Sequence, residues 1–367
     1  MAVAWLALVA AAALLLLCIT NSWQGCMFAF AALLLAALPR SVCRAYATKS
    51  KKLTWIAVSL IGGIIALLAV FVVDAVLSES SVSADHRVNE VFTADRSAWL
   101  RYSPTNLVPE ADQLAFGFTL MPFVDPILNQ ATASRLKKVT AEVYRELERD
   151  SDFRTLRSAM PDVYAELVGF RPVSGQVFVY APKTSKTRDA RPVVVFFHGS
   201  GGNFKAYLWV MAALADRLDF VLVAPSGGMG DWRGAQSTVA LESALVAAER
   251  LTTIDRRRIH VVGLSNGGRA VTQLGASSQE GIRTLTFISP VFDVQARESL
   301  DPRHPVLVVT GELDDRVPLD YVRENVQGFE RRGVNVELRT IPQADHFLMF
   351  THRHELSETL AAWLKNK

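Results

Sequence analysis

The stretch VVGLSNGGRA at residues 261–270 holds a serine, Ser265, in a Gly-x-Ser-x-Gly pattern. This pattern is typical of a sharp turn from a strand into a helix that exposes a nucleophilic serine. Gly263 and Gly267 would leave space where side chains would collide, and the hydroxyl would lie at the positive end of the following helix. Because chance can also supply five such residues, the pattern needs support from the rest of the sequence.

Residues that could activate this serine follow two later apolar runs. A serine hydroxyl is a weak nucleophile at neutral pH, so it needs a general base, which in turn needs an orienting carboxylate. The segment ELDDRVP supplies Asp314 and Asp315 after PVLVVTG, and PQADHF supplies His346 after VNVELRTI. We predict a catalytic triad of Ser265, His346 and Asp314, with Asp315 as the alternative acid.

Donors for the oxyanion of the transition state are expected in two loops. One is the backbone N–H of Asn266, directly after the serine. The other should come from HGSGGN at residues 198–203, where small residues let the backbone approach a substrate. We predict the N–H of Ser200, with Gly201 as the next candidate and as a substrate-binding residue. Trp232, in GGMGDWRG, is predicted either to line a substrate pocket or to pack within its loop.

The other histidines are expected to be structural. Those in or beside predicted strands should be core or edge residues, and those at the start of the final helix should be surface or capping residues. No group of side chains has the spacing of metal ligands, so we expect no metal and no cofactor. The histidines concerned are His198, His260, His304, His352 and His354.

Alternating strands and helices position these residues from about residue 170 onward. Strands that are apolar on both faces and separated by helices indicate a mostly parallel sheet with helices on both sides. Functional groups collect on the loops after the carboxyl ends of such strands, which is where the candidate residues lie. Short β-branched and aromatic runs predict strands at 176–182, 192–199, 220–225, 258–263, 284–289, 305–311 and 334–341.

Four segments together resemble the α/β-hydrolase superfamily: RPVVVFFHGSGGN, IDRRRIHVVGLSNGG, GELDDRVP and ADHF. The similarity is to its esterase, polyhydroxybutyrate-depolymerase-like and feruloyl-esterase-like branches, over about residues 170–367. It implies an α/β-hydrolase fold and a carboxylic-ester hydrolase that works through an acyl-enzyme. In this superfamily the GxxDxxVP pattern carries the acid at its first aspartate, here Asp314. Several secreted relatives contain stabilising disulfides, which this region lacks because it has no cysteine.

The first 77 residues have the composition of a membrane region. No charged side chain occurs over residues 1–39 or 53–73. The first run would make a helix of ~58 Å, too long for a bilayer core of ~30 Å, so it should break at the polar patch 21–25. We predict three transmembrane helices near 3–20, 25–39 and 53–76. A cleaved signal peptide is the alternative for the first, although it lacks a basic start and a cleavage site.

A short basic loop predicts the orientation of these helices. Residues 40–52 contain five basic residues and no acidic one, so the loop should stay in the cytoplasm and the globular part should lie on the non-cytoplasmic side. The net charge of +3 is spread along the chain, so nucleic acid is not an expected partner. The basic residues are Arg40, Arg44, Lys49, Lys51 and Lys52.

Residues 78–169 are predicted to be a linker and a helical connecting or cap region. The polar segment 78–96 is expected to be a linker, and spacings of three and four from Leu136 to Leu147 predict an amphipathic helix. A second short helix is expected to begin near Ser151 and to stop before Pro161. The apolar segment FGFTLMPFVDPIL at 116–128 could pack on the core, cover the active site or lie on the membrane surface.

Together these patterns predict a membrane-anchored serine hydrolase. Its expected partners are a small-molecule, lipid or polymer ester as substrate and the lipid bilayer around its N-terminal helices. One alternative is an acyltransferase that uses the same triad and passes the acyl group to another acceptor. Another is a catalytically silent module that binds a ligand or organises a membrane complex. A peptidase of this fold is the less favoured enzyme.

Overall fold

The computed structural model describes residues 2–20, 22–77, 86–93, 103–154, 156–169, 175–183, 190–277, 279–365 and 367. The chain divides into two compact units. The helical unit comprises residues 1–79 and 102–141, and the sheet unit comprises residues 80–101 and 142–367.

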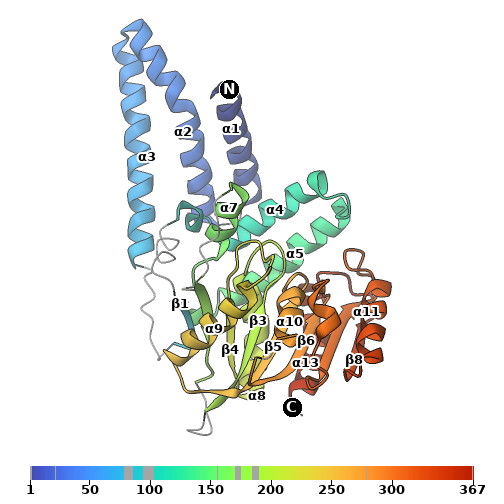
Figure 1. Cartoon of the computed structure of the whole chain (residues 1–367). Helices are drawn as coiled ribbons and strands as arrows, with labels where there is room; N and C mark the ends of the chain where they lie inside the picture. The colour runs from blue at the N-terminus through green and yellow to red at the C-terminus, as the bar shows by residue number, and fades with distance from the viewer. Residues whose placement is uncertain are drawn as a thin grey trace. The chain divides into compact units, whose positions relative to one another are not determined.

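The sheet unit contains one eight-stranded sheet in the order β1-β2-β4-β3-β5-β6-β7-β8 (Figure 1). β2 pairs antiparallel with β1 and with β4, and the strands from β4 to β8 pair in parallel. This confirms the predicted mostly parallel sheet. The strands are β1 (Val88–Phe92), β2 (Gln176–Tyr180), β3 (Arg191–Phe197), β4 (Val221–Pro225), β5 (Ile254–Leu264), β6 (Ile282–Ile288), β7 (Val306–Gly311) and β8 (Val336–Ile341).

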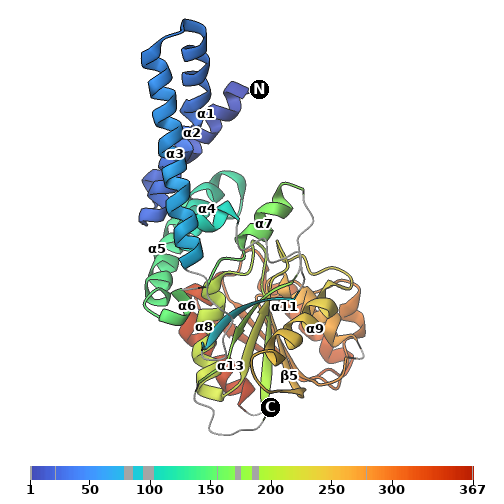
Figure 2. The same ribbon diagram turned by 90° about the vertical axis from the view of Figure 1, so that its left-hand side faces the viewer.

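Helices cover both faces of this sheet (Figure 2). One face packs against α9 (Gln236–Glu249), α10 (Gly267–Gly275) and α11 (Leu319–Arg331), whose apolar side chains share a core with alternate strand residues. On the other face, α8 (Lys205–Leu218) packs against α13 (Arg353–Leu364). Because both faces are covered, the last five residues of β3 are all buried, which explains their unbroken apolar run.

Shorter helices complete the sheet unit. They are α6 (Ser151–Arg154), α7 (Met160–Leu167), α12 (Leu348–Thr351) and the 3-10 helix η3 (Ala296–Ser299). The amphipathic helix predicted around Leu136 to Leu147 is α5 (Gln130–Leu147), which crosses the boundary between the two units at residue 141.

Strand β1 corrects the prediction of a linker over residues 78–96. Residues 88–92 pair with β2, and Val88 and Val91 are buried. The segment looks too polar for a strand because of Asn89 and Glu90, which are nevertheless 5% and 4% exposed. The carboxylate of Glu90 accepts a hydrogen bond from the side-chain amide of Gln176 at 2.6 Å. A partner 86 residues away thus satisfies the polar group, which composition cannot reveal. Residues 78–85 and 94–96 lie outside the described residues.

The helical unit begins with α1 (Ala2–Ile19), α2 (Trp23–Thr48) and α3 (Lys51–Leu77). The chain breaks between α1 and α2 at the polar patch, where the Ser22 hydroxyl accepts a hydrogen bond from the Gly25 N–H at 2.9 Å. The predicted loop over 40–52 is too long, because α2 continues through Pro39 to Thr48. Proline removes one helix hydrogen bond, and the residues after it contain no further helix breaker. The turn is confined to Lys49, with φ of +50°, and Ser50.

Among the described residues, α2 is the helix that is long and apolar enough to cross a membrane, and α1 contains a shorter apolar stretch, Leu6–Ile19. The three-span arrangement and its orientation stay predictions.

The apolar segment 116–128 forms most of α4 (Glu110–Val124), which follows the 3-10 helix η2 (Pro104–Leu107). The Asp112 carboxylate, in the first turn of α4, accepts hydrogen bonds from the hydroxyls of Thr20 and Ser22. The start of α4 is therefore tied to the break between α1 and α2.

Candidate active site

Three residues from the ends of three strands form a hydrogen-bonded chain. The hydroxyl Oγ of Ser265, after β5, lies 3.0 Å from Nε2 of His346, which follows β8. Nδ1 of His346 lies 2.9 Å from Oδ2 of Asp314, after β7. The structure thus brings together the three residues predicted as a triad, although Ser265 and His346 are 81 positions apart.

The turn at Ser265 is held open by its glycines. Ser265 itself has φ of +51°, a left-handed conformation that is strained for a non-glycine residue and frequent at functional sites. A Cβ at Gly263 would lie 2.4 Å from the Gly267 carbonyl oxygen, and one at Gly267 would lie 2.1 Å from the Phe197 carbonyl oxygen. Both glycines are therefore required by close backbone packing. The Ser265 N–H donates to the Ile288 carbonyl at 2.8 Å, which fixes the turn to β6.

The carboxylate beside His346 belongs to Asp314 and not to its neighbour Asp315, which is exposed. The Asp314 side chain is fully buried. Its Oδ1 accepts the backbone N–H groups of Arg316 at 3.1 Å and Val317 at 2.8 Å. These bonds hold the carboxylate in one orientation against the imidazole. An imidazole held in this way can accept the proton of the serine hydroxyl at Nε2, while Nδ1–H donates to the carboxylate.

His352 and His354, the other histidines near the C-terminus, form no hydrogen bond with Ser265. Nδ1 of His352 bonds the hydroxyl of Thr351 at 3.0 Å, and His354 borders a separate pocket near Arg87 and Asp216.

The loop after β3 passes directly over Ser265. A Cβ at Gly199 would lie 3.0 Å from Cβ of Ser265, so a larger residue there would push the loop or the serine out of place. The Asn266 side-chain amide donates to the Ser200 hydroxyl at 2.7 Å, which joins this loop to the serine turn. No hydrogen bond links the backbone N–H of Ser200 or of Asn266 to another described residue. By contrast, the Gly201 N–H donates to the Met229 carbonyl at 3.3 Å. Of the two candidates in the loop, Ser200 therefore keeps its N–H available.

His198 is a buried histidine, as predicted, but it also holds the loop after β3 in place. The sequence did not indicate this second role. The His198 ring is fully buried, and Nε2 accepts the Gly227 N–H at 3.1 Å. The proton must then be on Nδ1, which donates to the Gly199 carbonyl at 2.8 Å. Burial lowers the pKa of His198 to about 4, so the ring is neutral and keeps this tautomer at neutral pH.

Helix α7 contacts both the loop after β4, which contains Gly228 and Met229, and the loop after β3. The Glu166 carboxylate accepts the Met229 N–H at 2.6 Å, and the Asp162 carboxylate accepts the Gly228 N–H at 3.1 Å. A Cβ at Gly202 would lie 2.7 Å from the Val163 side chain, so α7 also packs directly on the loop after β3. The sequence gives no signal for these contacts, because acidic residues on a short helix are ordinarily solvated.

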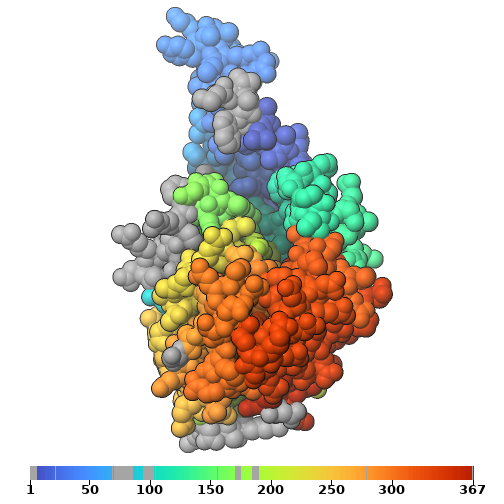
Figure 3. Space-filling model, turned by 45° about the vertical axis from the view of Figure 1, so that its right-hand side comes forward, coloured from blue at the N-terminus to red at the C-terminus, as the bar shows by residue number. Residues whose placement is uncertain are grey.

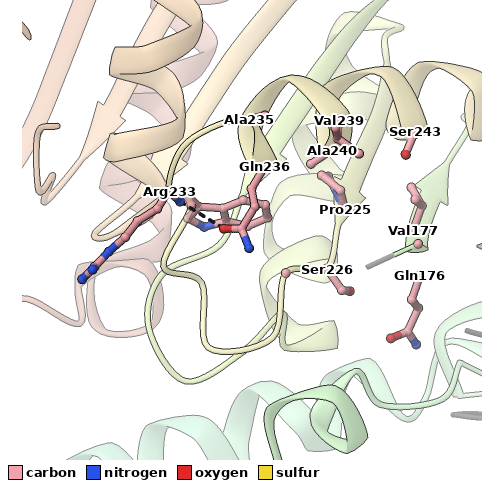
Figure 4. A pocket seen from close by; sticks show the side chains of 13 residues that line it. Gln176, Val177, Pro225, Ser226, Arg233, Ala235, Gln236, Val239, Ala240 and Ser243 are labelled. Atoms are coloured by element: carbon pink, nitrogen blue, oxygen red, sulfur yellow. Dashed lines mark hydrogen bonds between the residues drawn. The ribbon is translucent and has the colours of Figure 1, made fainter. Parts of the chain in front are cut away.

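Trp232 is packed within its loop. It is 2% exposed, its indole N–H donates to the His198 carbonyl at 2.8 Å, and its ring lies edge-on to Phe197 with centroids 5.0 Å apart. It borders a pocket of about 330 Å³ between α9 and the end of β4 (Figure 4). Neither Ser265 nor His346 lines this pocket. Of the two predicted roles for Trp232, the structure therefore favours packing.

Comparison with known proteins finds a matching family model and curated relatives. The prolyl oligopeptidase family matches residues 272–367. These residues form the continuous orange to red surface in Figure 3. One relative is the dihydrolipoyllysine-residue acetyltransferase component of the acetoin cleaving system of Cupriavidus necator, 29% identical over 142 residues. The match covers 35% of this chain and 38% of the relative, so this chain spans well under half of that protein.

Similar solved structures each cover 52% of this chain. A ferulic acid esterase has a TM-score of 0.44 at 18% identity, with 91% of its chain covered. A predicted CIB-like hydrolase from Thermoplasma acidophilum has a TM-score of 0.42 at 16% identity, with 93% covered. A hyperthermophilic esterase from Pyrobaculum calidifontis has a TM-score of 0.42 at 19% identity, with 81% covered. The strand order of the sheet unit and the position of Ser265 directly after β5 are those of the α/β-hydrolase fold that the sequence predicts.

Proposed function

We propose that this protein is a serine hydrolase that cleaves carboxylic esters. The observation that carries the proposal is the chain of hydrogen bonds from Ser265 through His346 to Asp314, with distances of 3.0 and 2.9 Å. Two further features suit acyl transfer. The strained turn presents the hydroxyl of Ser265, and Gly199 lets the loop after β3 approach the reacting serine closely.

In the proposed first half-reaction, Oγ of Ser265 attacks the ester carbonyl carbon and its proton passes to Nε2 of His346. The carbonyl oxygen becomes an oxyanion that accepts the backbone N–H groups of Ser200 and Asn266. The carbonyl re-forms, the bond to the leaving alkoxide breaks, and the alkoxide takes the proton from His346. This leaves an acyl-enzyme on Ser265 and releases the alcohol.

In the second half-reaction, water attacks the acyl carbon and gives its proton to His346. The tetrahedral intermediate collapses, Ser265 recovers the proton, and the carboxylic acid leaves. Throughout, the buried Asp314 carboxylate stabilises the imidazolium that forms twice in the cycle. Its two backbone N–H donors keep it oriented towards the imidazole.

A peptidase is the second candidate, because the prolyl oligopeptidase family matches residues 272–367. The acyl-enzyme would form in the same way, with an amine as the leaving group. An acyltransferase differs only in the second half-reaction, where a hydroxyl or amine of an acceptor replaces water. We favour the ester hydrolase because the segments around the site resemble esterase branches of the superfamily.

We further propose that α1, α2 and α3 anchor the protein in a membrane with the sheet unit on the non-cytoplasmic side. The length and composition of α2 and the five basic residues around the α2–α3 turn support this arrangement. A reporter enzyme fused after Leu77 would be active outside the cytoplasm. Activity of the reporter only in the cytoplasm would contradict the orientation.

A fluorophosphonate probe, which reacts with activated serines, tests the catalytic proposal on the purified full chain. We expect the wild type to be labelled once, and Ser265→Ala to remain unlabelled. Failure of the wild type to react would favour the catalytically silent module. Aryl esters, peptide amides and esters supplied with alcohol acceptors would then separate esterase, peptidase and transferase.

A further inference from the structure

Most exposed apolar side chains of the sheet unit belong to segments that are hydrogen-bonded to the candidate active site. Among its described residues, five large apolar side chains are exposed: Leu167 at 64%, Val168 at 72%, Val239 at 55%, Val294 at 70% and Leu313 at 55%. Single exposed apolar residues are ordinary on a protein surface. Four of these five, however, belong to loops and a helix that contact the site. We call Leu167, Val168, Val294 and Leu313 the apolar rim.

Two members of the apolar rim lie on loops that hold the triad. Leu313 directly precedes Asp314, and its N–H donates to the carbonyl of Ala344, two residues before His346, at 2.8 Å. Val294 lies on the loop after β6. The same loop is bonded to the nucleophile, because the Val291 N–H donates to the Ser265 carbonyl at 2.9 Å.

The other two members end helix α7, which stands at one end of the sheet (Figure 2). Leu167 and Val168 directly follow Glu166, whose carboxylate holds the Met229 N–H. The Met229 carbonyl in turn accepts the Gly201 N–H in the loop over Ser265. Ser265 follows β5, which lies between β3 and β6 in the sheet. Leu167 and Val168 belong to α7, which contacts the loops after β3 and β4 on one side of β5. Val294 and Leu313 lie on the loops after β6 and β7 on the other side.

From this distribution we infer that the site takes esters with a long acyl chain, of the kind found in membrane lipids. The inference rests on the proposed ester hydrolysis. An alkyl chain that leaves the carbonyl at Ser265 must cross the carboxyl edge of the sheet, where the apolar rim supplies the exposed apolar contacts. Burial of those side chains against the alkyl chain stabilises the complex, whereas a short acyl group cannot reach them. The chain's own apolar helix α2 would place the enzyme where such esters occur.

The test compares p-nitrophenyl acetate with p-nitrophenyl dodecanoate on the full chain in detergent. We expect wild-type kcat/KM to be higher for the dodecanoate. The double variants Leu167→Ser/Val168→Ser and Val294→Ser/Leu313→Ser should each lower the dodecanoate-to-acetate ratio about tenfold or more, with acetate hydrolysis changed less than about twofold. Because these side chains are largely exposed, the variants should fold, and thermal unfolding checks this.

Val239→Ser is the matched control. Val239 is as exposed as Leu313 but lies on α9, beside the pocket of Figure 4 that does not include the triad. The ratio should not change in this variant. A wild type that prefers acetate, or a control that lowers the ratio as much as the rim variants, would overturn the inference while leaving ester hydrolysis intact. Loss of both ester activities and of fluorophosphonate labelling would instead reject the proposed function.

Discussion

The serine turn and the loop after β3 face each other across the site, but they are held in different ways. The turn is fixed by its own glycines and by neighbouring strands, since a Cβ at Gly263 or Gly267 would collide with local backbone. The loop after β3 is fixed by remote groups: by the buried ring of His198, and by the loop after β4, whose Met229 bonds Gly201 through its carbonyl and Glu166 of α7 through its N–H. The turn should therefore fail only when its own residues change. The loop should also respond to changes far from the reacting atoms.

The largest effect is expected from the triad. Ser265→Ala and His346→Gln should each lower kcat for an ester by about 10⁴-fold or more, and the double variant should be little worse than either one, because the two residues act as a unit. Steady-state kinetics measures this. Additive losses in the double variant would show that the two side chains act independently.

Substitution within the turn should disrupt the fold as well as activity. Gly267→Ala places a methyl group 2.1 Å from the Phe197 carbonyl oxygen, so we expect a loss of about 3 kcal/mol or more in the free energy of unfolding. Gly328→Ala is the control, because Gly328 lies within α11 and its Cβ would make ordinary contacts at 3.6 Å or more. Denaturant unfolding should show the control unchanged or slightly more stable. Equal stability of the two variants would mean that the turn tolerates relaxation.

A remote change should weaken the loop after β3 with less damage to the fold. Removing the Glu166 carboxylate in Glu166→Ala frees the Met229 N–H, so we expect kcat to fall about tenfold with little change in KM. Glu166→Gln keeps an acceptor oxygen and should restore most of the rate. If both variants lose activity equally, the charge of Glu166 and not its hydrogen bond supports the site.

A last effect concerns stability at acidic pH and not catalysis. The pKa of His198 is lowered to about 4 by burial, so its neutral form stabilises the fold fully above pH ~6.5 and this contribution is lost as the pH falls towards 4. Between pH 7 and 4.5, the free energy of unfolding should fall by about 2 to 3 kcal/mol because of His198. Buried His260, whose pKa is also lowered to about 4, should lower it further. Urea unfolding at pH 7 and 4.5 measures the difference. His198→Asn should show a smaller difference than the wild type, and an unchanged difference would contradict the assignment.

Short sequence motifs predicted the elements whose causes are local. Ser265 and Asp314 each follow an apolar run that forms a buried strand, His346 follows the partly exposed strand β8, and parallel strands bring their carboxyl ends to one edge of the sheet. The predictions were wrong or incomplete where contacts between distant residues, or the surrounding helix, determine the local structure. Residues 88–92 form a strand because Glu90 has a buried partner in β2. Pro39 did not end α2, because one missing hydrogen bond does not stop a helix that is otherwise uninterrupted.

By itself, the sequence determined the order of strands and helices, the turn that exposes Ser265 and the candidates for its base and acid. These follow from periodicity, glycine positions and the chemistry of single side chains, all of which act over a few residues. Only the tertiary structure decided that Asp314 and not Asp315 faces His346, and that His198 and α7 hold the loops beside the serine. Those outcomes depend on which distant groups are buried together, and burial is a property of the folded chain.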